Sequence, residues 1–385
     1  MSGRTLLVTN DFPPRTGGIQ SYLHNLVVRQ PADSIVVYAS AWDGAQRFDA
    51  TLPFPVVRHP GRLMLPVPSV ARRARDVARS EGCSTVWFGA AAPLGLLAAD
   101  LRRRAGVDRA VASTHGHEVG WAQLPVARRA MRRIGDQVDV LTYLAEYTRV
   151  RISAAVGPHP VLVRLPSGVD LERFHPRPDG AADVRGRHGL AGRPVVVCVS
   201  RLVARKGQDM LIRALPALRA RVAGTALLCV GDGPDRARLA RLAREGGVER
   251  DVVFTGAVPV AELAAHYGAG DVFAMPCRTR RGGLEVEGLG LVYLEAAACA
   301  LPVVAGSSGG APDTVREGET GYVVSGRGLP QITRVIGDLL ADPAGAAQMG
   351  GRGRTWVADE WRWDVFAARL HGLLTGDRGS PGPQA

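Results

Sequence analysis

Short apolar runs alternate with helix-length amphipathic segments along the whole chain. Several runs are unbroken stretches of Val, Ile and Leu, which is typical of parallel strands covered on both faces. The segments between them suit crossover helices, so the pattern predicts an α/β fold with doubly wound sheets. The predicted strands are Leu6–Thr9, Ile35–Ala39, Val56–His59, Thr85–Phe88, Ala110–Ser113, Val138–Thr142, Val161–Leu165, Val195–Ser200, Ala226–Val230, Val252–Thr255, Val272–Met275, Pro302–Ala305 and Gly321–Val324.

The chain is long enough for two such domains. Its 385 residues exceed one ordinary domain and fit two. A turn-rich segment, Leu165–Asp170 followed by His175–Pro178, interrupts the alternation, which restarts at Val195. We therefore predict Rossmann-like domains over residues 1–166 and 167–359. The Gly-, Pro- and Ser-rich tail, residues 376–385, is predicted to be disordered.

Composition points to a cytoplasmic protein. No apolar run reaches the roughly 18 residues that a transmembrane helix needs, and we predict no secretion signal before the first strand. The cysteines are odd in number and widely spaced, which favours reduced core thiols. They are Cys83, Cys198, Cys229, Cys277 and Cys299.

Positive charge is concentrated in the first half of the chain. The net charge is +12, and residues 1–165 contain 21 arginines against 12 acidic residues. This excess suggests an anionic partner. The Arg-rich segments 72–75, 102–104 and 128–133 either meet an acidic membrane surface or form solvated helix faces. Nucleic acid is disfavoured, because aromatic residues are 5% of the chain and do not interleave with the arginines.

Unusual residues collect directly after the predicted strands in both halves. Ligands bind beyond the carboxyl ends of strands in open α/β sheets. These stretches therefore predict one ligand-binding cleft between the two domains. The stretches are residues 10–18, 89–93, 114–118, 201–207, 231–234, 276–290 and 306–310.

Lys206 is the single lysine in a chain with 47 arginines. A compact ammonium suits phosphate where a planar guanidinium does not fit. Arg201 lies five residues earlier, at a strand end. Together the two side chains predict a diphosphate grip, and the alternative is a pair of surface cations.

Glu287 and Glu295 lie eight positions apart, with Gly288, Leu289 and Gly290 directly after the first glutamate. A helix is expected from about Gly290, and eight helical residues rise about 12 Å. That exceeds the carboxylate spacing of glycosidases, roughly 5–9 Å. The spacing fits two contacts along an extended nucleotide-sugar. The alternative is a solvated Glu287 and a paired Glu295.

Gly17 and Gly18 open the first predicted helix, where backbone N–H groups can approach an anion. A plain turn is the alternative reading. The dinucleotide fingerprint G-x-G-x-x-G is absent here, and Gly231-Asp232-Gly233 lacks the third glycine. This argues against a nicotinamide enzyme.

His115, His117 and Glu118 follow a strand within a Gly-containing turn. Two histidines and a carboxylate suggest a metal, but no further ligands cluster nearby in the sequence. There is also no Asp-x-Asp motif of the kind that holds a divalent ion on a nucleotide-sugar. We therefore expect no metal and no other cofactor.

These motifs resemble the retaining glycosyltransferases of family 4, which have the GT-B fold. The resemblance rests on residues 165–176, Ser200–Leu202 with Lys206-Gly207, Val230–Pro234, and Glu287 with Glu295. Within the family the chain is most similar to an actinobacterial subgroup that uses GDP-mannose to mannosylate phosphatidylinositol monomannoside. The segments that carry this closer likeness are residues 9–22, 86–93, 113–121, 275–280, 286–290 and 361–364.

The resemblance implies roles for the candidate residues. Arg201 and Lys206 hold the donor diphosphate, Glu295 binds the ribose, and Glu287 with the backbone of Gly288, Leu289 and Gly290 holds the donor sugar. His115 lies beside the transferring sugar, and Gly17 and Gly18 lie near the phosphates and acceptor. The substrate-binding set also includes Asp11, Gly231 and Val258. The resemblance also implies that a last helix, residues 360–375, packs back on the N-terminal domain.

The implied activity is transfer of a second mannose, in α-1,6 linkage at the inositol, to a phosphoinositide-type lipid. The leaving diphosphate would take the acceptor proton on one face of the sugar. The protein would work peripherally on the inner face of the plasma membrane. Arg281–Glu285 departs from the subgroup pattern, so sugar selectivity stays open there. The alternatives are a different nucleotide-sugar donor or a soluble acceptor, a GT-B nucleotide-sugar epimerase, and a non-catalytic sugar-nucleotide-binding module.

Overall fold

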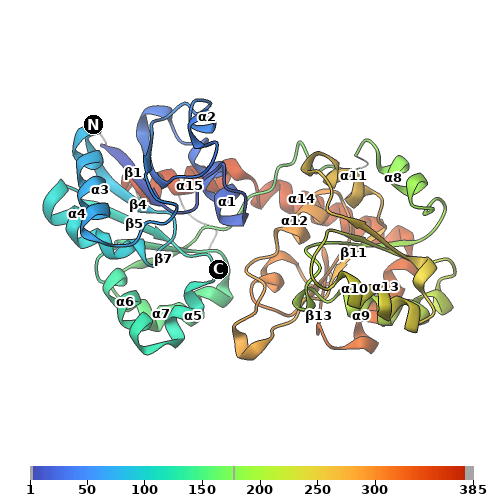
Figure 1. Cartoon of the computed structure of the whole chain (residues 1–385). Helices are drawn as coiled ribbons and strands as arrows, with labels where there is room; N and C mark the ends of the chain where they lie inside the picture. Colours follow the sequence, from blue (N-terminus) through green and yellow to red (C-terminus); the bar gives the residue numbers. More distant parts are fainter. Residues whose placement is uncertain (1–2, 177, 378–385) are drawn as a thin grey trace. The chain divides into compact units, whose positions relative to one another are not determined.

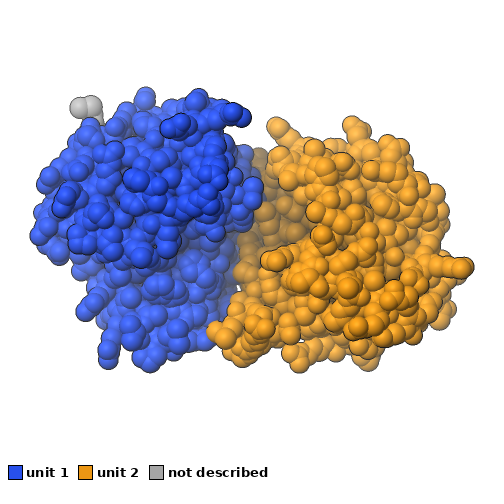
Figure 2. All heavy atoms as spheres, in the orientation of Figure 1, with its two compact units in different colours: residues 1–168, 363–385 blue, residues 169–362 orange. Residues whose placement is uncertain are grey.

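The computed structural model describes residues 3–176 and 178–377. By backbone contacts the chain divides into two compact units, coloured separately in Figure 2. Unit 1 is Met1–Gly168 with Trp363–Ala385, and unit 2 is Val169–Arg362. The first division falls two residues after the predicted boundary at 166, and the second falls three residues after 359.

Unit 1 contains a seven-stranded parallel sheet in the order β3-β2-β1-β4-β5-β6-β7. Figure 1 shows helices on its faces. The strands are β1 Arg4–Thr9, β2 Ile35–Ser40, β3 Val56–His59, β4 Cys83–Phe88, β5 Arg109–Ser113, β6 Val140–Tyr143 and β7 Val161–Arg164. The helices are α1 Gly18–Val27, α2 Ala45–Asp49, α3 Pro68–Ser80, α4 Ala98–Ala105, α5 Glu118–Gln123, α6 Pro125–Gly135, α7 Glu146–Val156 and α15 Trp363–Thr375.

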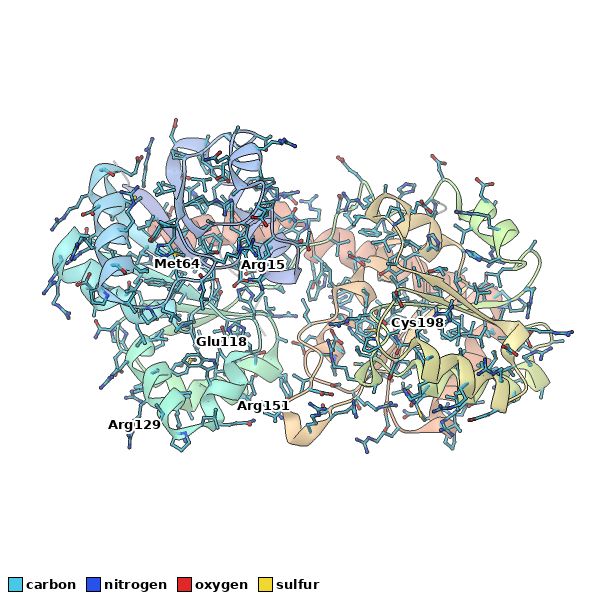
Figure 3. All side chains as sticks on the ribbon, viewed as in Figure 1. Arg15, Met64, Glu118, Arg129, Arg151 and Cys198 are labelled. Atoms are coloured by element: carbon cyan, nitrogen blue, oxygen red, sulfur yellow. The ribbon has the colours of Figure 1, made fainter. Side chains whose placement is uncertain are left out.

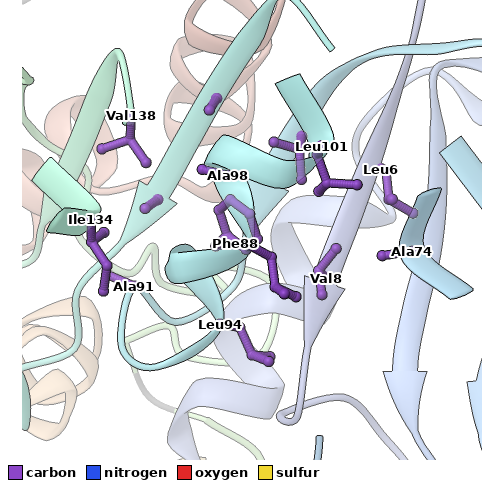
Figure 4. Packing of buried hydrophobic residues seen from close by; sticks show 14 of the residues in the cluster. Leu6, Val8, Ala74, Phe88, Ala91, Leu94, Ala98, Leu101, Ile134 and Val138 are labelled. Carbon is purple, nitrogen blue, oxygen red and sulfur yellow. The ribbon is translucent and has the colours of Figure 1, made fainter. Parts of the chain in front are cut away.

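The core of unit 1 lies between its sheet and the helices on one face. Leu6, Val8 and Phe88 of the central strands β1 and β4 are fully buried, and Figure 4 shows them against Ala98 and Leu101 of α4. The central strands are apolar on both faces because helices cover both, as the unbroken Val/Ile/Leu runs predicted.

Helix α15 belongs to unit 1 although it ends the described chain. It packs against α1, β4 and β5. Gln30 Nε2 donates to the Ala367 carbonyl at 3.0 Å, and Thr85 Oγ1 donates to the Leu374 carbonyl at 3.1 Å. The return of the last helix to the N-terminal part of the chain, implied by the resemblance, is therefore seen inside unit 1.

Unit 2 contains a six-stranded parallel sheet in the order β10-β9-β8-β11-β12-β13. The strands are β8 Val195–Val199, β9 Ala226–Val230, β10 Val252–Gly256, β11 Val272–Met275, β12 Val303–Gly306 and β13 Gly321–Val324. The helices are α8 Ala181–Arg187, α9 Gln208–Arg221, α10 Arg236–Glu245, α11 Leu263–Gly268, α12 Leu291–Ala298, α13 Leu329–Ala341 and α14 Pro343–Glu360.

The predicted fold class is confirmed, because all thirteen predicted runs are strands and both sheets are parallel. Several strand ends differ by one or two residues; β1, for example, begins at Arg4 and β4 at Cys83. All five cysteines are buried and unpaired, as expected for core thiols. Of the tail predicted to be disordered, residues 378–385 lie outside the described range. Among the described residues, no helix combines the length and apolar character needed to cross a bilayer.

Candidate active site

Lys206 and Glu287 meet inside unit 2, although they are far apart in the sequence. Lys206 ends a short 3-10 turn, Ala204–Lys206, that follows β8, and Glu287 lies in the loop between β11 and α12. The Lys206 Nζ donates to Glu287 Oε2 at 2.7 Å. The two residues are only 8% and 7% exposed. The structure thus joins two of the predicted site residues in one buried ion pair.

Arg205 is a third member of this cluster that the sequence analysis missed. One of its terminal guanidinium nitrogens lies 2.7 Å from the same Glu287 oxygen. Two cations therefore face one carboxylate, and the cluster carries a surplus positive charge. An anion near such a partly buried surplus is held more strongly than one in bulk water, because screening by solvent is weaker there.

Arg201 stands apart from this cluster. It follows β8 directly and is exposed, and within the described residues its guanidinium forms no ion pair with Glu287. Its backbone carbonyl accepts a hydrogen bond from Gln208 Nε2 at 3.3 Å, which ties the main chain after β8 to the first residue of α9. Its side chain is thus left available to an anion at the carboxyl end of β8.

Backbone contacts with the loop after β12 hold Glu287 in place. The Gly310 N–H donates to the Glu287 carbonyl at 3.0 Å. A Cβ on Gly309, where φ is +58°, would lie 1.8 Å from that same carbonyl oxygen. Only glycine fits this approach. The loop of residues 306–310, one of the stretches of unusual residues that follow a predicted strand, thereby positions the backbone of Glu287.

Glu295 lies within α12, four residues after that helix begins at Leu291. Its Oε2 accepts a hydrogen bond from the Tyr267 hydroxyl at 2.7 Å. Burial raises the pKa of Glu295, and the hydrogen bond from Tyr267 partly opposes that shift. The helix expected from about Gly290 is confirmed: Gly290, with φ +85°, is the N-cap of α12, which begins at Leu291, so only the second half of the step from Glu287 is helical.

Gly231 brings the ends of three strands of unit 2 together. Its N–H donates to the Gly256 carbonyl at 2.9 Å, and a Cβ there would lie 2.3 Å from the Ser200 carbonyl oxygen. The backbone segments at the carboxyl ends of β8, β9 and β10 therefore lie in close contact with one another. Val258 lies in the loop directly after β10, and is partly buried.

In unit 1, His115 lies just beyond β5. Its Nε2 lies 2.6 Å from the carbonyl oxygen of Gly89, which follows β4. A carbonyl oxygen only accepts, so Nε2 carries the hydrogen and Nδ1 is left as an acceptor. Burial lowers the pKa of His115, which keeps the imidazole neutral near neutral pH. The Tyr22 ring packs edge-on against it, with 5.2 Å between ring centres.

Glu118 fixes the turn that carries His115. Its side chain is fully buried, and its Oε2 accepts the backbone N–H groups of His115 and Gly116 at 2.9 and 3.1 Å. The other oxygen lies 3.2 Å from His117 Nε2. From the sequence alone, Glu118 is identifiable only as a possible metal ligand. The residues that the structure describes contain no group of three or more His, Cys, Asp or Glu placed to hold a metal ion.

Gly17 and Gly18 lie at the start of α1, and Asp11 lies in the loop after β1. Asp11 Oδ1 accepts from Gln20 Nε2 at 2.7 Å, which ties the loop after β1 to the helix. Both glycines are exposed, and neither a side-chain cap nor an acidic residue occupies the first turn. The first N–H groups of α1 are therefore open to an anion.

Two protein-family models match the chain. The model described as "Glycosyltransferase Family 4" matches residues 16–173, and the model described as "Glycosyl transferases group 1" matches residues 193–342. The two matches fall in the two halves of the chain.

Curated proteins of mycobacteria are similar over nearly the full length. The chain is 58% identical to the "GDP-mannose-dependent alpha-(1-6)-phosphatidylinositol monomannoside mannosyltransferase" of Mycolicibacterium smegmatis, covering 97% of this chain and 98% of that protein. It is 53% identical, over the same shares, to the Mycobacterium tuberculosis protein of the same name.

Solved structures show the same fold at low sequence identity. Anabaena HepE in complex with UDP has a TM-score of 0.81 at 18% identity, covering 97% of this chain and all of that one. Sucrose-phosphate synthase from Thermosynechococcus elongatus has a TM-score of 0.75 at 22% identity, with 96% and 98% covered. At this identity the likeness concerns the fold.

The depressed pKa of His115 predicts that the folded state loses stability in acid. Between the lowered folded pKa and the ordinary value of 6.5, the unfolded chain binds more protons at this position than the folded one. Its contribution to stability is therefore complete above about pH 6.5 and is lost as pH falls through the folded pKa. The melting temperature of the full chain should fall less steeply between pH 7.5 and 5 in His115→Asn than in the wild type. Equal slopes would show that His115 is not buried in its neutral form.

Proposed function

The chain belongs to glycosyltransferase family 4, and from this premise we propose that it transfers mannose from GDP-mannose to phosphatidylinositol monomannoside, forming an α-1,6 linkage with retention of configuration. One observation carries the proposal: 58% identity across 97% of the chain to a protein of that named activity. The buried cluster of Lys206, Arg205 and Glu287 supplies the chemistry that such a donor requires.

The donor diphosphate is assigned to the cations of unit 2. Arg201 is exposed beyond β8, and Lys206 and Arg205 leave a surplus positive charge beside Glu287. Developing negative charge on the leaving diphosphate is stabilised by fixed cations of this kind. Because Lys206 and Arg205 are already held by hydrogen bonds to Glu287, these two cations need little reorganisation during the reaction.

The sugar and ribose are assigned to the two glutamates. Only one oxygen of Glu287 is bonded to the cations, so Oε1 can accept from a mannose hydroxyl, beside the backbone of Gly288, Leu289 and Gly290. Glu295 can accept ribose hydroxyls while Tyr267 holds its Oε2. Carboxylates that accept from sugar hydroxyls orient the donor and contribute to rate through positioning.

We assign retention of the anomeric configuration to a reaction in which the acceptor attacks mannose C1 on the same face from which the diphosphate leaves. The bond between mannose C1 and the diphosphate oxygen breaks as the acceptor oxygen bonds to C1, and the acceptor proton passes to the diphosphate. Glu287 accepts from two cations through Oε2 and is assigned to a mannose hydroxyl through Oε1, and Glu295 is assigned to the ribose, so neither carboxylate is placed to attack C1. This favours the diphosphate as the proton acceptor.

The acceptor and the transferring sugar are assigned to unit 1. The unprotonated Nδ1 of His115 can accept a sugar hydroxyl, while Glu118 keeps its turn in place. The open N–H groups at Gly17 and Gly18, with Asp11 beside them, suit the phosphate and hydroxyls of an inositol-phosphate headgroup. The lipid acceptor implies peripheral work at the inner face of the plasma membrane, where anionic lipids attract the basic first half of the chain.

A product assay tests the function directly. Purified protein, GDP-mannose and phosphatidylinositol monomannoside in detergent micelles should yield GDP and a dimannosylated lipid with a new α-1,6 linkage, identified by mass spectrometry and NMR. UDP-sugars should give little product. An altered donor without lipid product would mean an epimerase, and donor binding without turnover would mean a binding module.

Replacing the single lysine should impair catalysis more than folding. We expect Lys206→Ala, and likewise Arg201→Ala, to lower turnover by tens-fold or more, because about 1.4 kcal/mol of lost transition-state stabilisation is tenfold. Arg213, which is exposed in α9 of the same unit, provides the matched control, and we expect Arg213→Ala to leave turnover unchanged.

The control for folding removes both charges of the buried pair. Lys206→Met with Glu287→Gln removes the buried ammonium and the buried carboxylate together, and it leaves only the guanidinium of Arg205, which is partly exposed to solvent, without its partner. Its melting temperature should therefore stay near the wild-type value while its activity is lost. Full activity in a folded Lys206→Ala variant would contradict the assignment of this residue.

Transfer is proposed to proceed without a metal, because Arg201, Arg205 and Lys206 place positive charge where a divalent ion would act on the diphosphate. Excess EDTA should leave the initial rate within about twofold, and added Mg²⁺ or Mn²⁺ should not raise it further. A rate abolished by EDTA and restored by one of these ions would overturn this part of the proposal.

A further inference from the structure

Glu295 differs from Glu287 in having no cation beside it. Glu287 accepts from Lys206 and Arg205, each at 2.7 Å. Within residues 3–176 and 178–377, no lysine or arginine forms an ion pair with Glu295. Its Oε2 accepts a hydrogen bond from the Tyr267 hydroxyl at 2.7 Å. A partly buried carboxylate needs such a partner to stay ionised, so the charge of Glu295 depends on a neutral donor.

Tyr267 is held in place as that donor. It lies near the end of α11 and is fully buried. Its ring packs edge-on against Phe174 and tilted against Phe273, with 5.7 Å between ring centres in both pairs. Burial raises the pKa of Tyr267 well above its ordinary value, so the hydroxyl keeps its proton at neutral pH. The ring is therefore fixed by aromatic packing on two sides, and its hydroxyl remains a donor.

Two buried thiols lie near the pair of Tyr267 and Glu295. Cys299 directly follows α12, and Cys198 lies on β8, where Figure 3 shows it inside unit 2. Burial raises the pKa of each thiol to about 12, so both are neutral at physiological pH. Neither thiol therefore adds a charge next to the carboxylate.

The arginines of the surrounding elements have other hydrogen-bond or ion-pair partners. Arg354 of α14 donates to two backbone carbonyls at 2.8 and 3.1 Å. The Arg173 guanidinium lies 3.7 Å from the Asp170 carboxylate. Burial raises the pKa of Glu295, the hydrogen bond from Tyr267 lowers it, and the more distant Arg173 lowers it less. The phenol is thus the main group that keeps this carboxylate charged.

We propose that Tyr267 is a positioning residue through which the enzyme selects nucleotides that carry ribose hydroxyls. Its hydrogen bond holds Glu295 in the ionised form and in one orientation, ready to accept from the 2′- and 3′-hydroxyls. A site built to bond hydroxyls rejects a ligand that lacks them, because the carboxylate would be left unpaired. The inference deepens the proposed function and rests on its assignment of the ribose to Glu295.

Calorimetric titration of the full chain with GDP and with 2′,3′-dideoxy-GDP tests this role. The wild type should bind GDP about a hundred-fold more tightly than the dideoxy analogue. Tyr267→Phe keeps the packed ring and removes only the hydroxyl. It should weaken GDP binding about tenfold and weaken binding of the analogue less than about twofold. The preference for the ribose hydroxyls should therefore fall about tenfold.

Tyr293 provides the matched control in the same unit. It is fully buried in α12, two positions before Glu295, and its hydroxyl donates to the Met275 carbonyl at 2.7 Å. Tyr293→Phe should leave the ratio of the two affinities at the wild-type value. Equal weakening of both nucleotides by Tyr267→Phe would show a merely structural role and would overturn the inference.

The pH dependence of the preference is a second readout. Losing the donor favours the protonated carboxyl of Glu295, whose pKa burial already raises. The ratio of GDP to analogue affinity, in which titration of the diphosphate cancels, should therefore decline at a higher pH in Tyr267→Phe than in the wild type. Glu295→Gln should abolish this pH dependence, and adding Tyr267→Phe to it should not change the ratio further. An unchanged midpoint in Tyr267→Phe would contradict the proposal.

The product assay separates this inference from the proposed function. A wild type that mannosylates the lipid from GDP-mannose yet binds the two nucleotides equally would overturn the inference and leave the function standing. A wild type that binds GDP but forms no mannosylated lipid would sink the function. Loss of the ribose preference in Tyr267→Phe would still support the positioning role in that case.

Discussion

The structure of the candidate active site depends on one buried carboxylate held by two cations. Removing Glu287 from water costs several kcal/mol, and only charge pairing and hydrogen bonds repay that cost. Lys206 and Arg205 both reach the same oxygen of Glu287 at 2.7 Å. The turn after β8 and the loop after β11 must therefore adopt one mutual arrangement, and loss of one partner would leave a charge buried without compensation.

Other contacts reinforce that arrangement from outside the cluster. The Arg278 N–H donates to the Arg205 carbonyl at 2.8 Å, and its guanidinium donates to both oxygens of the Asp209 carboxylate at 2.8 Å. Asp209 lies in the first turn of α9, so the loop after β11 is fastened to the segment that follows Lys206. In unit 1 a buried Glu118 does similar work by holding the turn of His115 through two backbone N–H groups. In both units a buried carboxylate fixes a loop that carries a candidate site residue.

The fold and the position of Lys206 in unit 2 were predictable because both produce a local pattern in the sequence. Buried parallel strands read as apolar runs, and Lys206 stands out against an arginine background. Arg205 does not stand out against that background, although it makes the same contact with Glu287. The hydrogen bond from Tyr267 to Glu295 joins residues 28 positions apart in different helices, and no local pattern encodes it. The start of α12 was predictable as well, because Gly290 stands directly before the helix that begins at Leu291.

Fold likeness and sequence identity carry different parts of the functional argument. A backbone similar to that of HepE, with a TM-score of 0.81 at 18% identity, preserves the strand ends beyond which ligands bind in open α/β sheets. It does not select the base or the acceptor, because those depend on side chains and loop conformations that vary at such identity. Identity of 58% across 97% of the chain leaves far less room for such variation. The buried ion cluster is a separate argument about the class of ligand. Surplus cations beside an anchored carboxylate fit a diphosphate joined to a sugar. A bare sugar would not use the cations, and a bare phosphate would not use the carboxylate.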